Sequence, residues 1–132
     1  MKARAVVMES QGAPEVLQVR DVDLPAPGPG EALVRQTAVG LNYLDVYHRS
    51  GAYPLPLPSG CGSEAAGVVE AVGPDVTALA PGDRVAYQGG PPGAYASARI
   101  VPAWRLAKLP AGVSEEQAAA LMLKGMTVEY LL

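Results

Sequence analysis

Turn-forming residues divide this chain into short segments of strand length. The 13 prolines and 15 glycines are spread along the 132 residues and are not gathered in one linker. Proline and glycine both interrupt regular elements, so this distribution favours many short strands joined by tight turns. The sequence therefore predicts a mainly β domain, built as a small barrel or sandwich and accompanied by short helices.

The expected strands alternate with turn sequences such as Pro81-Gly82-Asp83. They cover residues 2–8, 16–22, 31–41, 65–72, 84–88, 94–101 and 104–109. Each segment is rich in apolar or β-branched residues and is bounded by turn residues, which is typical of strands. Because the chain has no phenylalanine, the core is expected to rest on Val, Leu, Ala and a few Tyr, together with Trp104.

Two passages predict helices. Residues 42–49 form a short helix for which Asn42 is a suitable N-cap. Ser114 and Gln117 have the spacing of a capping box, which predicts a helix over residues 117–123. Gly125 is expected to interrupt it, so that residues 126–132 begin a new, apolar helix without a stop signal. We therefore expect this domain to be part of a larger protein.

Composition excludes several classes of partner and location. The formal net charge is −3 and no Lys/Arg cluster occurs, which disfavours nucleic-acid binding. No apolar run approaches the roughly 20 residues needed to span a bilayer, and the start lacks the apolar region of a signal peptide. A single cysteine, Cys61, excludes an internal disulfide and suits the reducing cytoplasm. We expect a cytoplasmic protein with no nucleic-acid or membrane partner.

The chain lacks the glycine-rich turn that holds a dinucleotide pyrophosphate. No G-x-G-x-x-G sequence occurs between a predicted strand and a predicted helix. The stretch from residue 89 to residue 93 has three glycines, but its two prolines remove backbone donors that would face a phosphate. A dinucleotide would need its pyrophosphate site elsewhere.

A series of motifs resembles the medium-chain dehydrogenase/reductase superfamily. The segments are residues 60–69 (GCGSEAAGVV), Val72-Gly73 and residues 82–85 (GDRV). Residues 12–17, 40–54 and 124–128 narrow the resemblance to its zinc-free, NADPH-dependent quinone oxidoreductase branch, which includes zeta-crystallin. This resemblance implies a GroES-like β-barrel over residues 1–123, with residues 124–132 starting the helix that leads to a Rossmann domain. That domain is absent from this chain, so we expect the 132 residues alone to be inactive.

The same resemblance implies chemistry without a metal. Asn42 and Ser63 stand where zinc-dependent relatives have a cysteine and a histidine, and His48 and Cys61 are the only soft ligands in the chain. A tetrahedral zinc site needs three or four such groups, so no metal is expected. Hydride transfer from NADPH to a quinone fits, because a quinone accepts hydride without a Lewis acid and its oxyanion needs only hydrogen-bond donors.

The resemblance also implies roles for particular residues. Asn42 and Tyr47 are the implied catalytic residues, and Tyr53 is implied to line the substrate cleft. The implied cofactor-binding residues are Tyr43, Leu44, Asp45, Val46, Tyr47, Lys124, Thr127 and Tyr130. The full-length protein is expected to be a homodimer that binds a small-molecule quinone.

Each of these residues also has a purely structural interpretation. Asn42 could cap a helix in which Asp45 and Arg49 form an i,i+4 ion pair. Tyrosines at i,i+4 spacing are usually packed in a core, and Lys124, Thr127 and Tyr130 could form a polar stripe on a buried helix. We further expect Glu64 to be structural, His48 to lie on the surface, and Cys61 not to act as a nucleophile.

Two other functions remain open beside the quinone reductase. An enoyl-thioester or other alkene reductase of the same superfamily would also reduce a conjugated carbonyl compound. A non-catalytic GroES-like binding module would explain the missing cofactor domain. The first would be distinguished by its substrates, and a reading frame that continues past Leu132 would exclude the second.

Overall fold

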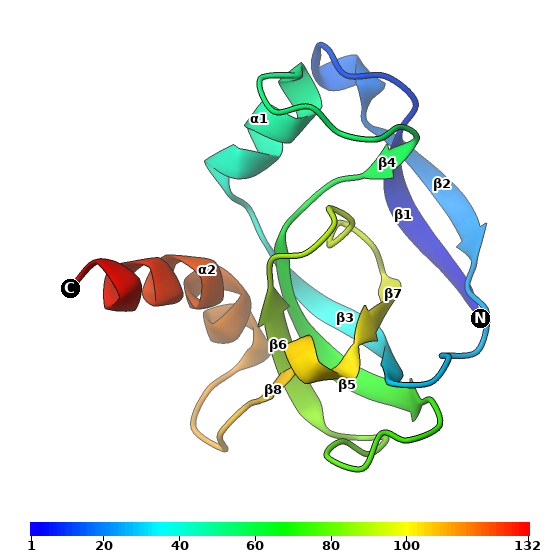
Figure 1. Ribbon diagram of the computed structural model, residues 1–132, viewed down its shortest axis with the longest axis vertical. Helices are drawn as coiled ribbons and strands as arrows, with labels where there is room; N and C mark the ends of the chain where they lie inside the picture. The colour runs from blue at the N-terminus through cyan, green and yellow to red at the C-terminus, as the bar shows by residue number, and fades with distance from the viewer.

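The computed structural model describes residues 1–132 as two antiparallel sheets with two α-helices (Figure 1). The strands are β1 (Lys2–Met8), β2 (Gln18–Asp23), β3 (Glu31–Gly40), β4 (Ser59–Gly60), β5 (Glu64–Val72), β6 (Arg84–Gln88), β7 (Ala98–Pro102) and β8 (Ala107–Lys108). The helices are α1 (Tyr43–Ser50) and α2 (Glu115–Leu131). The strand orders are β2-β1-β4 and β7-β3-β5-β6-β8. Every pairing is antiparallel, so the chain contains no parallel sheet of the Rossmann type.

Backbone hydrogen bonds join the two sheets into a barrel. The N–H of Val6 in β1 donates to the carbonyl of Tyr95 at 2.8 Å, and the N–H of Ser97 donates to the carbonyl of Arg4 at 2.8 Å. The N–H of Gln36 in β3 in turn donates to Ser97 O at 2.9 Å. The segment before β7 therefore links both sheets, and the strands curve around a common centre in Figure 1. The predicted mainly β barrel is confirmed.

Small side chains fill most of the core. Val34, Val69 and Val85 are fully buried with Ala32 and Leu79 in one cluster. The expectation of a Val, Leu, Ala and Tyr core is thus confirmed. One large aromatic side chain, Tyr87, is fully buried beside these small residues, in a second cluster with Ala65, Ala94 and Val101.

The assignment of Trp104 to the core is wrong. Its side chain is 78% exposed, and the guanidinium of Arg105 lies 4.4 Å from the centre of the indole ring. Trp104 lies in a short 3-10 helix, Ala103–Arg105, that interrupts the strand expected over residues 104–109. Only Ala107–Lys108 of that segment pairs as a strand, and the turn directs the indole to solvent.

Four of the seven predicted strands agree with the structure to within one residue at each end, and two more differ besides the segment of Trp104. Residues 2–8 and 84–88 are strands as predicted, and those predicted over 31–41 and 65–72 differ by one residue at one end. The second strand starts only at Gln18, because Pro14–Val16 forms a 3-10 turn. The strand expected from residue 94 starts at Ala98, because residues 94–97 form the irregular link between the sheets.

The helix α2 begins as predicted but does not break. Ser114 Oγ accepts the Gln117 N–H at 3.1 Å, and Gln117 Oε1 accepts the Ser114 N–H at 2.9 Å, so the capping box is confirmed. The predicted interruption at Gly125 is wrong, since one helix runs from Glu115 to Leu131. A helix-interior glycine costs only about 0.5–1 kcal/mol, which is too little to end a helix of this length. The proposed division between residues 123 and 124 therefore falls inside α2, and as a domain boundary it stays a prediction.

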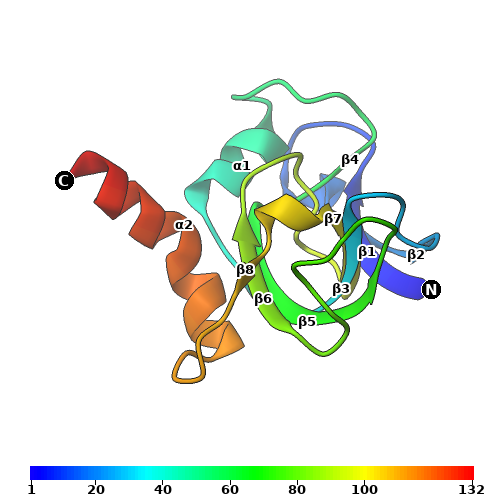
Figure 2. The ribbon, with the colours of Figure 1, turned by 60° about the horizontal axis from the view of Figure 1, so that its bottom comes forward.

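Only the first half of α2 packs on the barrel. Ala118 and Ala119 are buried against Ala66 and Ala86 of β5 and β6. Arg84 of β6 donates through Nε and Nη2 to the two carboxylate oxygens of Glu115, both at 3.0 Å. Beyond Leu123 every residue of the helix is exposed, and Figure 2 shows this end projecting away from the barrel. No helix has both the length and the apolar character needed to cross a membrane.

Candidate active site

A buried carboxylate joins three distant parts of the chain. Glu64 is completely buried, and its Oε1 accepts a hydrogen bond from Asn42 Nδ2 at 2.7 Å. Its Oε2 accepts the backbone N–H of Leu123 at 2.7 Å, and Lys124 Nζ lies 3.2 Å from Oε1. Lys124 Nζ also donates to Asn42 Oδ1 at 2.9 Å. Asn42, Glu64 and Lys124 therefore form one connected polar cluster.

Three elements bring this cluster together. Asn42 is the N-cap of α1, two residues after the end of β3. Glu64 is the first residue of β5, and the pairing of β3 with β5 places it opposite Gly40. Lys124 is supplied by α2, which packs over the same strands. A Cβ atom on Gly40 would lie 2.2 Å from the carbonyl oxygen of Ala119, so glycine here permits the helix to approach.

Asp45 has a structural environment. Its side chain is 3% exposed, and it accepts hydrogen bonds from Asn42 N at 3.0 Å, Ser63 Oγ at 3.0 Å and Tyr95 Oη at 2.6 Å. The Asp45–Arg49 ion pair considered for α1 does not form, because Arg49 Nη1 donates instead to Gly12 O at 2.6 Å. With both carboxylate oxygens engaged, the side chain of Asp45 holds α1 to the barrel, and the implied cofactor contact is left to its backbone.

Three tyrosines form a continuous aromatic surface. The rings of Tyr43 and Tyr47 have centroids 5.2 Å apart in an edge-to-face arrangement, and those of Tyr47 and Tyr53 are 5.1 Å apart. Their exposed fractions are 70%, 39% and 49%, respectively, so the interpretation as core packing is wrong. We call these three residues the tyrosine surface. Such flat, partly exposed faces can stack on a planar ring.

Gln11 is a positioning residue that sequence reasoning missed. Its Nε2 donates to both His48 O and Tyr53 O, each at 2.8 Å, and so ties the loop after α1 to the loop after β1. No local pattern identifies a glutamine in a glycine- and proline-containing loop, because both of its partners lie about 40 residues further along the chain.

The remaining predicted cofactor residues lie along the outer parts of the helices. Leu44 and Val46 are partly buried in α1, and Tyr130 is 85% exposed near the end of α2. The hydroxyl of Thr127 donates to Leu123 O at 2.7 Å within its own helix. Of the predicted residues on α2, only Lys124 joins the cluster with Asn42. The polar stripe on a buried helix is wrong, because this part of α2 is exposed.

The predictions for His48 and Cys61 agree with the structure to different degrees. The prediction that His48 lies on the surface holds only in part, since the residue is partly exposed but its Nδ1 is buried without a hydrogen-bond partner and its ring lies 6.1 Å from that of Tyr53. Cys61 is 1% exposed, and burial, followed by the charge of Asp45, raises the pKa of its thiol. A thiol that is buried and protonated is a poor nucleophile. No group of three or more His, Cys, Asp or Glu side chains is arranged to hold a metal ion.

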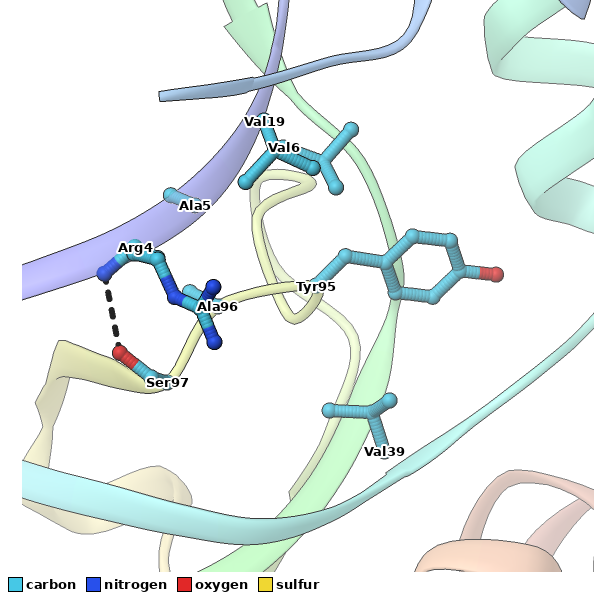
Figure 3. Close-up of a pocket in the computed structure, with 8 residues that line it drawn as sticks. All are labelled: Arg4, Ala5, Val6, Val19, Val39, Tyr95, Ala96 and Ser97. Atoms are coloured by element: carbon cyan, nitrogen blue, oxygen red, sulfur yellow. Dashed lines mark hydrogen bonds between the residues drawn. The ribbon is translucent and has the colours of Figure 1, made fainter. Parts of the chain in front are cut away.

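The largest cavity lies away from this cluster. It has a volume of about 340 Å³ and is lined by Arg4, Ala5, Val6, Val19, Val39, Tyr95, Ala96 and Ser97 (Figure 3). A smaller cavity of about 80 Å³ includes Asp45, Cys61 and Tyr95. The tyrosine surface lines none of the cavities. The candidate active site is therefore an open face beside a buried polar cluster, and not an enclosed pocket in this chain.

Three partly or fully buried acids, Cys61, Tyr87 and Tyr95, predict weaker stability in alkali. Burial raises the pKa of Tyr87, and burial and the hydrogen bond to Asp45 raise that of Tyr95. With Cys61, these groups keep their protons in the folded state at a pH where the unfolded chain releases them. The folded state then binds more protons, so the free energy of unfolding falls as pH rises above about 8.5–10. Urea midpoints measured across this range should decline, and Tyr95→Phe should make the decline shallower. An unchanged slope in Tyr95→Phe, compared with the exposed control Tyr130→Phe, would contradict this assignment.

The antiparallel barrel, the helix cap at Asn42 and the buried carboxylate at the start of β5 can be compared with known protein families. Residues 28–111 match the family model described as the alcohol dehydrogenase GroES-like domain. The chain belongs to this family, and the predicted GroES-like fold is confirmed.

Similar proteins fall within the predicted branch. A quinone oxidoreductase from Pseudomonas aeruginosa is 53% identical over 131 residues, and a 2-haloacrylate reductase from Burkholderia sp. is 44% identical over 135 residues. These alignments cover 98% and 97% of this chain, and 40% of each relative. The crystal structure of Escherichia coli quinone oxidoreductase complexed with NADPH is 47% identical and superposes with a TM-score of 0.95, over 98% of this chain and 40% of that one. The chain thus spans about 40% of the length of the curated relatives that it matches.

Proposed function

We propose that this chain is the substrate-side domain of an NADPH-dependent quinone reductase that transfers hydride to a quinone without a metal. The observation that carries the proposal is the Asn42–Glu64–Lys124 cluster. Asn42 is the N-cap of α1, and the next residue, Tyr43, begins the tyrosine surface. The similarity to quinone oxidoreductases, one of them solved with NADPH, supports the same reaction. The proposed enzyme acts in the cytoplasm as a homodimer on a small-molecule quinone.

The residues suit a planar acceptor that gains negative charge. Reduction of a quinone carbonyl creates an oxyanion, which hydrogen-bond donors stabilise. The side chain of Lys124 is 51% exposed while its ammonium remains held by Asn42 and Glu64, so it can meet an oxyanion at the surface. Asn42 has a second amide hydrogen beyond the one given to Glu64. Tyr47 and Tyr53 would provide the aromatic wall against which the quinone ring lies.

The residues also fit one end of a nicotinamide cofactor. NADPH supplies the hydride, while the protein orients donor and acceptor. Tyr43, Tyr47, Lys124 and Tyr130 offer exposed aromatic faces and one cation, and we propose that they bind the cofactor together with Leu44, Val46, Thr127 and the backbone of Asp45. The chain has no glycine-rich pyrophosphate turn. We therefore expect the 132 residues alone to oxidise no NADPH.

The proposal is tested with the complete gene product, NADPH and a series of 1,4-quinones. Loss of NADPH absorbance that depends on the quinone is the expected result. In the Tyr53→Ala variant, the KM for the quinone should rise about tenfold, because one face of the aromatic wall is lost. The control is Trp104→Ala, which removes a more exposed aromatic residue that takes no part in the cluster. Equal effects of the two substitutions on the KM would show that Tyr53 does not contribute to quinone binding.

An alkene reductase is the second candidate, favoured by the 44% identity to a 2-haloacrylate reductase. Both reactions deliver hydride to a conjugated system, so the same donors and aromatic faces serve either one. Enoyl thioesters and 2-haloacrylate should be compared with quinones by kcat/KM in the complete protein. Turnover of the alkenes alone would favour the alkene reductase over the quinone reductase. No turnover of either substrate class would favour a non-catalytic binding module.

A further inference from the structure

Glu64 is the only carboxylate in the chain whose side chain is fully buried with a lysine as its ion-pair partner. Three donors face it, namely Asn42 Nδ2, the Leu123 N–H and Lys124 Nζ. No other acidic side chain makes a hydrogen bond to Asn42 Nδ2 or Lys124 Nζ. The orientation of these two groups therefore depends on Glu64.

We propose that Glu64 is a positioning residue for the reductase site, acting through Asn42 and Lys124 without touching the substrate. An asparagine amide can turn by 180° with little change in shape. The carboxylate of Glu64 accepts only hydrogen bonds, so it selects the orientation with Nδ2 toward Glu64 and Oδ1 toward Lys124. It also holds Lys124 through the neighbouring Leu123 N–H, which couples the position of α2 to the amide of Asn42. This inference rests on the proposed function.

Stability alone does not account for this arrangement. A buried ion pair loses about as much hydration energy as it regains by attraction, and apolar replacements are often equally stable. Glu64 does what an apolar residue could not do, because it fixes the direction of one amide and one ammonium that border the tyrosine surface. A charge buried at this position is thus better explained by geometry at the site than by the stability of the barrel.

The test is Glu64→Gln in the complete protein. Glutamine has the same shape but only one acceptor oxygen, so its NH₂ group must face either the Leu123 N–H or the Asn42 and Lys124 donors that share Oε1. In the first case the helix turn that carries Lys124 is pushed away, and in the second the Asn42 amide or the Lys124 ammonium must turn. We expect kcat per correctly folded site to fall about 10- to 100-fold, because small displacements of orienting groups have effects of this size. The KM for the quinone should change by less than about threefold, since the tyrosine surface is untouched.

Glu115→Gln is the matched control. Glu115 is also a carboxylate that fastens α2 to the barrel, through Arg84, but it does not contact Asn42 or Lys124. It should lower the melting temperature while leaving kcat per folded site unchanged. Equal losses of kcat in the two variants would overturn the proposal, because they would show that Glu64 acts only through the attachment of α2.

A crystal structure of the Glu64→Gln protein separates this inference from the proposed function. The expected result is a reoriented Asn42 amide or a displaced Lys124 ammonium, with the barrel unchanged. If both groups keep their positions, the inference is wrong even when the wild-type protein reduces quinones. If the wild-type protein reduces no quinone, the proposed function fails and a role in the reductase site fails with it, whereas displacement in the crystal would still establish what Glu64 orients.

Discussion

Replacing Gly40 with alanine should lower the free energy of unfolding by about 3 kcal/mol. The added Cβ would lie 2.2 Å from Ala119 O and 2.4 Å from both Cγ and Oε1 of Glu64. Overpacking against a backbone atom cannot be relieved by turning a flexible side chain, so β3 or α2 must move. Because the helix carries Lys124 and Leu123, the same change should disturb the cluster around Glu64. Urea unfolding followed by circular dichroism measures the loss.

Gly125→Ala is the paired control for Gly40→Ala. A Cβ on Gly125 meets nothing within 4 Å, and the residue lies in the exposed interior of α2. Alanine should therefore stabilise the protein by about 0.5–1 kcal/mol through its higher helix propensity. A destabilising effect would indicate that the helix does not continue through this position. A Gly40→Ala protein as stable as the wild type would show that α2 does not pack on the barrel as described.

Asp45→Ala should destabilise the protein by about 3 kcal/mol. The substitution leaves three donors without their acceptor, namely the Asn42 N–H, the Ser63 hydroxyl and the Tyr95 hydroxyl. Each buried donor that loses its partner costs roughly 1–3 kcal/mol, and part of this cost is offset where water enters. Alanine is the better helix former, so a loss of stability cannot be attributed to helix propensity. Urea midpoints at neutral pH provide the measurement.

Two further variants make the Asp45 result specific. Asp45→Asn keeps one acceptor oxygen and should lose less stability than Asp45→Ala. Asp21→Ala removes an exposed carboxylate that makes no hydrogen bond to another side chain, and it should change stability by less than about 0.5 kcal/mol. If Asp45→Ala were as mild as Asp21→Ala, the three hydrogen bonds would not form in solution.

Local signals in the sequence were sufficient for much of the fold. The capping box of Ser114 and Gln117 and the N-cap at Asn42 lie next to the helices that they begin, so short patterns identify them. The strand between Arg84 and Gln88 follows a clear turn and pairs as expected. These features depend on neighbours within a few residues, and they are therefore readable without knowledge of the tertiary structure.

The errors arose where tertiary contacts override local preference. The segment from residue 94 to residue 97 has the composition of a strand, but its backbone bonds to β1 and β3 instead of extending β7. Gly125 is a helix breaker by propensity, yet the hydrogen-bonded ladder of α2 continues through it. Trp104 is large and apolar, but the turn in which it lies points it outward. None of these outcomes is encoded within a short window of sequence.

In the candidate site, too, the sequence predicts local features but not tertiary contacts. The i,i+4 spacing of Tyr43 and Tyr47 correctly places them side by side, but only the structure shows that they are exposed and joined by Tyr53. The sequence predicts a structural role for Glu64, but it does not reveal which residues Glu64 contacts. Its hydrogen bonds to Asn42 and Lys124 span 22 and 60 residues of the chain. Asn42 and Lys124 are brought together by that carboxylate, and no periodicity could reveal it.

The two hydrogen bonds from Gln11 connect the loop after β1 to His48 and to Tyr53, which is one end of the tyrosine surface. Tyr53 is anchored through its own carbonyl to a segment more than 40 residues earlier, while its ring is left free. Changes of length or sequence in that early loop can therefore shift one wall and leave Asn42 and Lys124 in place. If Tyr53 lines the quinone site as proposed, acceptor preference can change by this route without any substitution at Asn42 or Lys124.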